Sequence, residues 1–169
     1  MQLLIDTFQS LPPFIATFLI AMLPVSELRG AIPVAILIYD TPWPLAMVIA
    51  IAGNMLPVYF LLLFFEVVAN WLMKRFHWAK WLFDWLFERT RRKLNVQVRK
   101  YGYWALAIFV AIPLPATGAW TGAMAAFVFG LPKKKSFLAI LLGVCLAAIV
   151  VTIVTISGNA VMMKLLLIK

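Results

Sequence analysis

The sequence has few of the residues that most enzymes use for chemistry. Its 169 residues include one cysteine, one histidine and six acidic side chains against 15 basic ones. The single cysteine, Cys145, excludes an intramolecular disulfide and any metal site built from several cysteines. The sole histidine, His77, lies among basic and aromatic residues, which is typical of an interfacial residue rather than a ligand. No His, Cys or carboxylate cluster has catalytic spacing, so we expect no enzyme activity, no metal and no other cofactor.

Charge of either sign is scarce, and apolar residues dominate. Charged residues make up 12% of the chain and hydrophobic residues 65%, a balance typical of an all-α, polytopic membrane protein. The net charge of +9 would suggest a nucleic-acid partner in a soluble protein, but here the basic residues flank apolar segments and suit anionic lipid headgroups. We therefore expect membrane lipids as partners, no nucleic acid, and a single membrane domain over residues 1–169.

Two opposite charges, Glu27 and Arg29, interrupt the first apolar stretch in the segment AMLPVSELRGAIP. A charge at the centre of a bilayer costs about 2.5–3.5 kcal/mol on insertion scales, so this pair makes a poor ordinary span. Pro24 and Pro33 should break or end the flanking helices.

Each apolar arm beside this segment has about ten residues, or roughly 15 Å of helix, against a hydrocarbon core of roughly 30 Å. We therefore predict a re-entrant helical hairpin over residues 14–39 with SELRG at its tip. The alternative is one kinked spanning helix with an internal pair of Glu27 and Arg29.

The rest of the first half contains one long apolar segment and one basic segment. Residues 45–69 are long enough to span a membrane, although Gly53, Asn54 and Pro57 should weaken the helix. These residues fit either a functional break or tight packing of a small-residue face against the hairpin. In residues 70–100, lysine and arginine alternate with tryptophan and phenylalanine. This pattern predicts a basic amphipathic interfacial helix on the cytoplasmic leaflet.

The second half repeats the layout of the first. Residues 103–131 have two apolar arms around PLPATGAWTG, which predicts a second re-entrant hairpin, and residues 136–162 form a second apolar segment. Shifting the first half by 90 residues places Pro42 on Pro132 and Gly53 on Gly143.

The basic residues test this architecture. If all four apolar segments crossed the membrane, the linker and Lys133, Lys134 and Lys135 would lie on opposite sides. Re-entrant hairpins put them on one side and invert the second repeat, 101–169, relative to the first, 1–69, as in many secondary transporters. We predict a cytoplasmic linker and both termini outside.

Two hairpin tips that meet near the midplane would form a substrate site. Helices that resume around Ala31 and Ala119 would point their N-termini there, which favours an anion. Arg29 would bind a phosphate or carboxylate, and Glu27 would hold Arg29 or take up a proton, unless the two form a permanent, purely structural ion pair. The candidate substrate-binding residues are Glu27, Arg29, Ser26, Gly30, Pro115, Thr117, Gly118, Trp120 and Thr121.

SELRGAIP together with PLPATGAWTG resembles the pair of motifs in the putative small multidrug export protein family, and the likeness in layout covers nearly the whole chain. That family is similar, more distantly, to the DedA and VTT membrane proteins, which have two inverted re-entrant hairpins, each followed by a transmembrane helix. The resemblance implies drug export or movement of polyprenyl phosphate or phospholipid, in some relatives with proton dependence. The chain lacks the arginines of the second DedA hairpin. The resemblance therefore implies a functional role for only two residues of this chain, Glu27 and Arg29.

We therefore predict a transporter in a plasma (inner) membrane of bacterial or archaeal type. Its substrate would be an anionic lipid or another amphipathic anion, with Glu27 as the candidate proton carrier. One alternative is a proton-coupled exporter of cationic drugs, in which Glu27 alternates between proton and drug. The other is a non-transport scaffold or assembly factor that uses the linker to grip the leaflet or a partner. Small residues along both spans would permit a homodimer.

Overall fold

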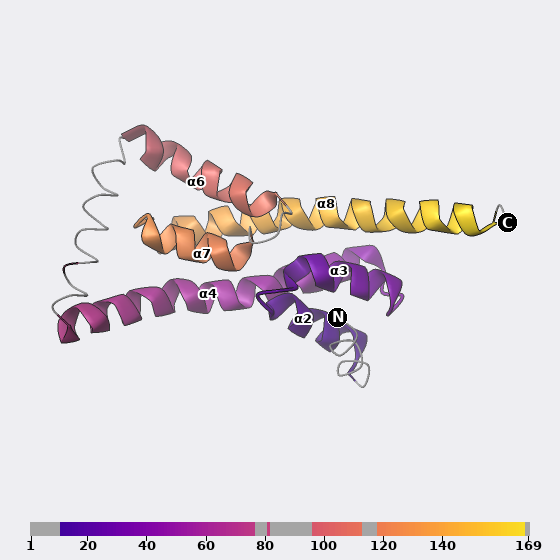
Figure 1. Cartoon of the computed structure of the whole chain (residues 1–169), viewed down its shortest axis with the longest axis horizontal. Helices are drawn as coiled ribbons and strands as arrows, with labels where there is room; N and C mark the ends of the chain where they lie inside the picture. Colours follow the sequence, from indigo (N-terminus) through magenta and orange to yellow (C-terminus); the bar gives the residue numbers. More distant parts are fainter. Residues whose placement is uncertain (1–10, 77–80, 82–95, 113–117, 168–169) are drawn as a thin grey trace. The chain divides into compact units, whose positions relative to one another are not determined.

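The computed structural model describes residues 11–76, 81, 96–112 and 118–167. Within these residues every regular element is a helix, as the composition predicted (Figure 1). The helices are α2 (Pro13–Met22), α3 (Glu27–Leu37), α4 (Trp43–Arg75), α6 (Val96–Ala111), α7 (Ala119–Val128) and α8 (Lys133–Leu167). Most of the predicted interfacial linker, including His77, and the tip residues Pro115 and Thr117 lie outside the described residues.

The short helices α2 and α3 are the two arms predicted for the first hairpin. They have 10 and 11 residues, about 15 Å of helix each. α2 begins at Pro13, whose fixed φ suits the first helical position, and the carbonyl of Pro12 accepts the N–H groups of Ile15 and Ala16. The two helices lie side by side (Figure 1). The chain thus forms a helical hairpin here, and its re-entrant placement in a membrane stays a prediction.

Two details of the predicted first hairpin are wrong. α3 begins at Glu27 rather than around Ala31, because the carbonyl of Ser26 already accepts the amide of Gly30, which forms the first hydrogen bond of the helix. Pro33 does not end the helix, which continues to Leu37. A proline inside a helix removes one backbone hydrogen bond, and the bonds on either side carry this helix past it.

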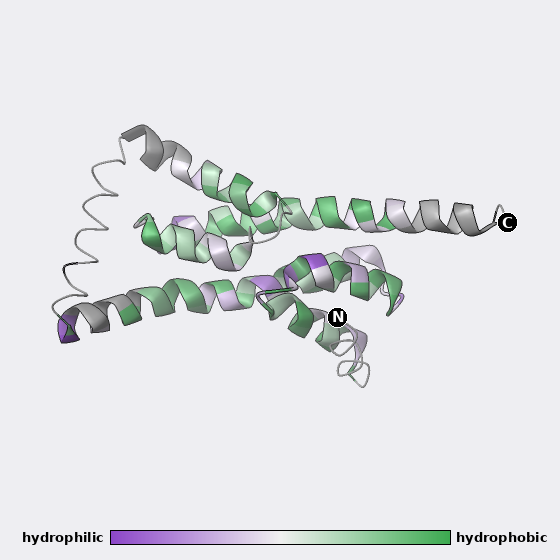
Figure 2. Cartoon of the chain, in the orientation of Figure 1, coloured by the Kyte–Doolittle hydropathy of each residue, from purple (hydrophilic) through white to green (hydrophobic). Residues whose placement is uncertain are grey.

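The helices α4 and α8 are much longer, with 33 and 35 residues. Within them, Trp43–Phe65 and Lys133–Gly158 are long and apolar enough to cross a membrane, close to the predicted spans 45–69 and 136–162. The weak point expected in the first span does not interrupt α4, which runs through Pro57. Hydrophobic colours dominate both stretches in Figure 2.

The long helices also carry many large apolar side chains on their outer surface. Phe60 and Phe64 of α4, and Ile153 and Val154 of α8, are each more than half exposed. Soluble monomers rarely expose apolar surface on this scale. The composition and these faces together describe a membrane-type helical protein.

The chain forms two compact units. Unit 1 comprises Met1–Leu56 and Val144–Lys169, and unit 2 comprises Pro57–Gly143. Each unit contains one helical hairpin, the first part of the long helix that follows this hairpin, and the last part of the other long helix. The helix pair α2 and α3 belongs to unit 1, and the pair α6 and α7 to unit 2.

Close helix packing in unit 1 depends on a glycine. Gly53 of α4 approaches α2 so closely that a Cβ at this position would meet the carbonyl oxygen of Phe18, as well as the Cβ of Ala21 at 3.0 Å. Small residues let helix backbones approach in this way, and such contacts drive helix association where the surroundings are as apolar as the helices. At Gly53, therefore, the close-packing alternative is the one that the structure bears out.

Unit 2 makes the same kind of contact with its own helices. A Cβ at Gly143 of α8 would meet the carbonyl oxygen of Ala107 in α6 at 2.5 Å and the Cβ of Val110 at 2.8 Å. The rings of Phe65 in α4 and Phe127 in α7 stack with their centroids 5.4 Å apart. In each unit, a glycine of the long helix therefore rests against the first helix of the preceding hairpin.

Other backbone landmarks recur at the same offset of 90 residues that the sequence shows. α4 begins at Trp43 and α8 at Lys133. Three residues before each start the backbone turns into the left-handed region, at Asp40 with φ 49° and at Gly130 with φ 59°. The two halves of the chain therefore share the start of the long helix and the turn before it, and not only a few sequence letters.

Candidate functional site

The turn between α2 and α3 is closed by hydrogen bonds from its own residues. Ser26 donates its hydroxyl to the carbonyl of Ile20 over 2.7 Å, which ties the turn back onto the last turn of α2. The amide of Gly30 donates to the carbonyl of Ser26 over 2.8 Å. A Cβ at Gly30 would lie 2.9 Å from the Cβ of Ser26. Both predicted site residues therefore shape the tip, and the serine hydroxyl is engaged within it.

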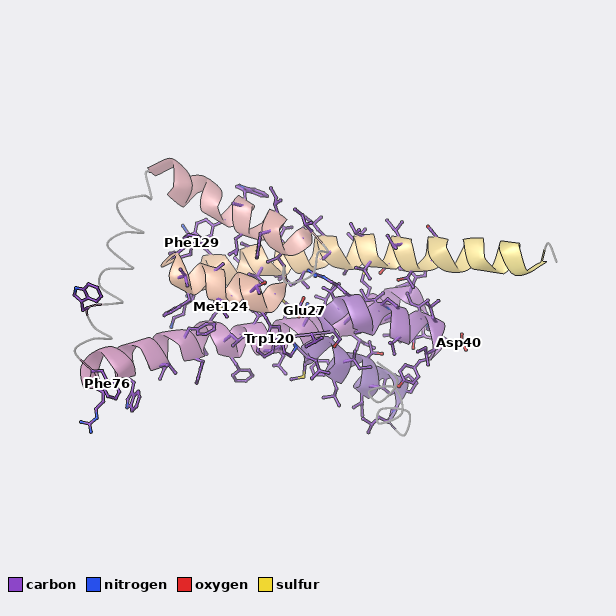
Figure 3. The ribbon with its side chains drawn as sticks, viewed as in Figure 1. Glu27, Asp40, Phe76, Trp120, Met124 and Phe129 are labelled. Carbon is purple, nitrogen blue, oxygen red and sulfur yellow. The ribbon has the colours of Figure 1, made fainter. Side chains whose placement is uncertain are left out.

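Glu27 is the most unusual residue of this tip. Its side chain is buried, with 6% exposure, and its backbone has φ 47°, in the left-handed region. An L-residue other than glycine is destabilised there by roughly 1–2 kcal/mol, and residues held in this way cluster at functional sites. Figure 3 shows Glu27 at the start of α3, at the other end of this helix from Asp40. The structure thus holds a strained, buried carboxylate at the predicted position.

Arg29 lies in the first turn of α3, two residues after Glu27, and its side chain is only partly buried. The carboxylate of Glu27 interacts electrostatically with its guanidinium. The two charges thus lie close enough to act on each other, and their role as a pair stays a prediction. The acid is the enclosed member of the pair and the arginine is the more accessible one.

The second tip is described from Gly118 onward. Gly118 caps the start of α7: its amide donates to the hydroxyl of Thr121 over 2.8 Å, and that hydroxyl donates back to the carbonyl of Gly118 over 3.1 Å. Trp120, labelled in Figure 3, is partly buried on the same helix. Thr121 thus uses its hydroxyl to start a helix, a role that the sequence analysis did not foresee.

The predicted site residues belong to different units. Ser26, Glu27, Arg29 and Gly30 come together in unit 1, whereas Gly118, Trp120 and Thr121 come together in unit 2. The meeting of the two tips therefore stays a prediction.

Unit 1 contains two further polar groups that the predicted site did not include. Asn54 of α4 is fully buried, and neither its Oδ1 nor its Nδ2 has a hydrogen-bond partner; the buried hydroxyl of Thr152 in α8 has none either. By contrast, Thr17, Ser136 and Thr155 each donate to the carbonyl four residues earlier.

An unpartnered amide in an apolar interior costs about 1–3 kcal/mol. Asn54 therefore calls for a ligand group or a second state that satisfies it. The one sequence signal for this residue was an amide inside an apolar segment, which does not say whether the amide is buried or paired.

The site offers charge and hydrogen-bonding groups rather than metal ligands. Among the side chains that the structure describes, no three His, Cys, Asp or Glu residues lie close enough together to hold a metal ion. Unit 1 instead contains one buried carboxylate, one partly buried guanidinium and one buried amide. Such a set can bind an ionic or hydrogen-bonding ligand and can take up a proton.

The family model described as "Putative small multi-drug export protein" matches residues 27–150. The match begins at the strained Glu27, leaves out α2 and the turn before α3, and takes in the second tip, all of α4 and about the first half of α8. No curated protein and no solved structure matches the chain. The more distant likeness to DedA and VTT proteins is not shown by these comparisons and stays a prediction.

Proposed function

This chain belongs to the putative small multi-drug export protein family, and on that premise we propose that it is a membrane transporter for small amphipathic anions. The observation that carries the proposal is the charged pair at the start of α3. Polar and ionisable groups inside membrane proteins are costly and usually functional. An exporter site for an anion needs a positive charge, and the partly exposed Arg29 supplies one.

The local geometry supports an anion rather than a cation as the substrate. The start of a helix carries a partial positive charge and unpaired amides, and Arg29 lies in the first turn of α3. A guanidinium stays charged in an apolar environment and binds carboxylate or phosphate through two parallel hydrogen bonds. Glu27 holds the arginine from the buried side, so a substrate anion can replace the carboxylate as its partner. Polyprenyl phosphate and phospholipids are candidate substrates.

The repeated landmarks support an alternating-access transporter. In the proposed architecture each repeat is a re-entrant hairpin followed by a spanning helix, the two repeats have opposite orientations, and the two tips face one midplane site. The matching helix starts, left-handed turn residues and close-packed glycines in the two halves favour such a repeat. In this architecture the 70–100 linker is cytoplasmic and both termini are outside.

A second candidate, proton-coupled export of cationic drugs, is favoured by the description of the family and by the burial of Glu27. A buried carboxylate could alternate between a proton and a positively charged drug. In that case Arg29 would only repel the substrate, which makes this candidate the weaker one on geometric grounds.

Transport by the purified protein in proteoliposomes tests both candidates. One set of vesicles contains a fluorescent polyprenyl phosphate, and a second set contains a fluorescent cationic dye, each with and without a pH gradient. The variants are Arg29→Ala and Glu27→Gln. The matched control is Arg75→Ala, which removes an exposed arginine at the end of α4.

If the proposal is right, the wild type and Arg75→Ala move the anionic lipid, and Arg29→Ala loses at least nine-tenths of this rate while remaining folded. Dye export that survives Arg29→Ala and is lost in Glu27→Gln would establish the second candidate. Unchanged anion transport in folded Arg29→Ala would refute the anion site.

A further inference from the structure

Asn54 is the polar group of unit 1 that the charged pair does not explain. Its amide is completely buried, and both its acceptor and its donor are unsatisfied. Leucine has a similar volume and no polar atoms, so packing alone does not require an amide here. The unsatisfied amide therefore points to a partner that is present in another state of the protein.

A short chain of contacts connects Asn54 to the tip that carries Glu27. The preceding residue, Gly53, rests against Ala21 at the end of α2. The neighbour of Ala21, Ile20, accepts the hydroxyl of Ser26, and Ser26 directly precedes Glu27. Both side chains are buried in unit 1, and these contacts of their neighbours in the sequence run from one to the other.

The chemistry of the amide limits what can satisfy it. A metal ion would bind Oδ1 and leave Nδ2 unpaired, while an anion would bind Nδ2 and leave Oδ1 unpaired. A protonated carboxyl group satisfies both, because its carbonyl oxygen accepts from Nδ2 and its O–H donates to Oδ1. Glu27 is the one carboxyl group found buried among the side chains that the structure describes.

We propose that Asn54 is the hydrogen-bond partner of Glu27 in its protonated state. The inference deepens the proposed function, on which it rests, because it names the residue that couples a proton to the anion site. A proton from water adds to one carboxylate oxygen of Glu27, and no other covalent bond changes. The neutral carboxyl group then pairs with the amide of Asn54 and releases Arg29 to bind the substrate anion. The proton and the anion are therefore carried together.

Few other charges act on this switch. Arg29 is the charged residue of α3 beside Glu27, and α2 contains no titratable side chain. The part of α4 in unit 1 contains none either, and in the described side chains of α8 in this unit the thiol of Cys145 is the titratable group. The partner of Glu27 therefore changes from Arg29 to Asn54 when the proton binds.

The test follows the carboxyl group itself, by infrared spectroscopy of the full chain in lipid vesicles across a pH series. The C=O stretching band that disappears in Glu27→Gln is assigned to protonated Glu27. The test variant is Asn54→Leu, and the matched control is Thr152→Val, which removes a second buried hydroxyl or amide group of unit 1 that lacks a hydrogen-bond partner. No substrate is needed for this measurement.

In Asn54→Leu we expect the Glu27 band to move to the frequency of a carboxyl group without hydrogen bonds. The midpoint of Glu27 protonation should fall by about one pH unit, a tenfold loss of proton affinity that corresponds to about one net hydrogen bond. Thr152→Val should keep both values of the wild type. An unchanged band and midpoint in Asn54→Leu, or an equal shift in Thr152→Val, would overturn the proposal.

Two further observations keep the outcome clear. If Asn54→Leu does not fold, Asn54→Ser and Asn54→Ala replace it. The serine hydroxyl can both donate and accept a hydrogen bond, so the Glu27 band of Asn54→Ser should lie closer to the wild-type frequency than the band of Asn54→Ala. Equal spectra in these two variants would overturn the pairing. The spectroscopic result is also separable from transport. A normal titration in a wild type that moves no anion would refute the proposed function and leave the pairing intact.

Discussion

Replacing Gly53 with alanine tests whether close packing of α4 on α2 holds unit 1 together. In an exposed helix interior this substitution is favourable by about 0.8–1.0 kcal/mol, because alanine has the higher helix propensity. At Gly53, however, the new methyl group would meet the carbonyl of Phe18 and the Cβ of Ala21. These are backbone or first side-chain atoms that cannot rotate away, so the two helices must separate.

Overpacking of this kind costs typically 1–3 kcal/mol. Because the obstacle is largely backbone, we expect the upper half of that range and a net loss of about 1–2 kcal/mol in the free energy of unfolding. Gly158 supplies the matched control: it lies in α8, and a Cβ there meets nothing within 4 Å. Gly158→Ala should be neutral or stabilising by up to about 1 kcal/mol.

Thermal unfolding of both variants in the same detergent measures the difference. The two variants should differ by about 1–3 kcal/mol, so at about 2–4 °C for each kcal/mol in a chain of this size, Gly53→Ala should melt roughly 2–12 °C below Gly158→Ala. Equal melting temperatures for the two alanine variants would show that α4 and α2 do not pack as closely as described, and the packing argument for unit 1 would fail.

Three further predictions concern turn geometry, capping and topology. Asp40→Gly should stabilise the protein by about 1 kcal/mol in thermal unfolding, because it removes a left-handed aspartate, and a loss of stability would contradict the strain argument. Thr121→Val should destabilise α7 by about 1 kcal/mol while Thr121→Ser does not, since only the hydroxyl forms the cap. Equal melting temperatures of the two variants would show that this cap does not stabilise the protein. In a background with Cys145→Ala, single cysteines at Arg75 and Lys134 should react with an impermeant reagent from the same side of the membrane, whereas four full crossings would place them on opposite sides.

The sequence was sufficient to predict the helical elements and their order, for clear physical reasons. Two apolar arms too short to span, separated by Pro24 and two charges, predicted a helical hairpin, and long apolar runs predicted the two spans. Local composition determines these features, because helix length and hydropathy follow directly from consecutive residues. The landmarks at an offset of 90 residues were also visible as repeated prolines and glycines before any backbone geometry was known.

The details of the site were harder to predict. The early start of α3 depends on the left-handed backbone of Glu27, a conformation that side-chain identity disfavours and that only the surrounding turn imposes. Pro33 looked like a helix end because a lone proline usually is one, yet the helix continues through it. In both places tertiary context outweighs local propensity.

Asn54 shows a different limit of sequence reasoning. Its position in an apolar segment was evident, but the same pattern fits an amide that faces water, bonds a neighbouring helix or stays unpaired. Only the fold shows that it is buried without a partner. The predicted roles of Thr121 and Ser26 were incomplete for the same reason, because a hydroxyl can serve a ligand or the local backbone, and hydrogen-bond geometry decides between them.

The length of the two apolar spans has a consequence for the membrane itself. Spans of 23 and 26 residues correspond to about 35 and 39 Å of helix, while a typical hydrocarbon core is about 30 Å thick. In the proposed architecture, in which both helices cross the membrane, the excess is taken up by tilting the helices or by thickening the lipid around them, at a cost of fractions of a kcal/mol for each Å of mismatch. The length of the lipid acyl chains would then change the tilt of the two helices, because thicker bilayers would relieve the tilt that thinner ones impose.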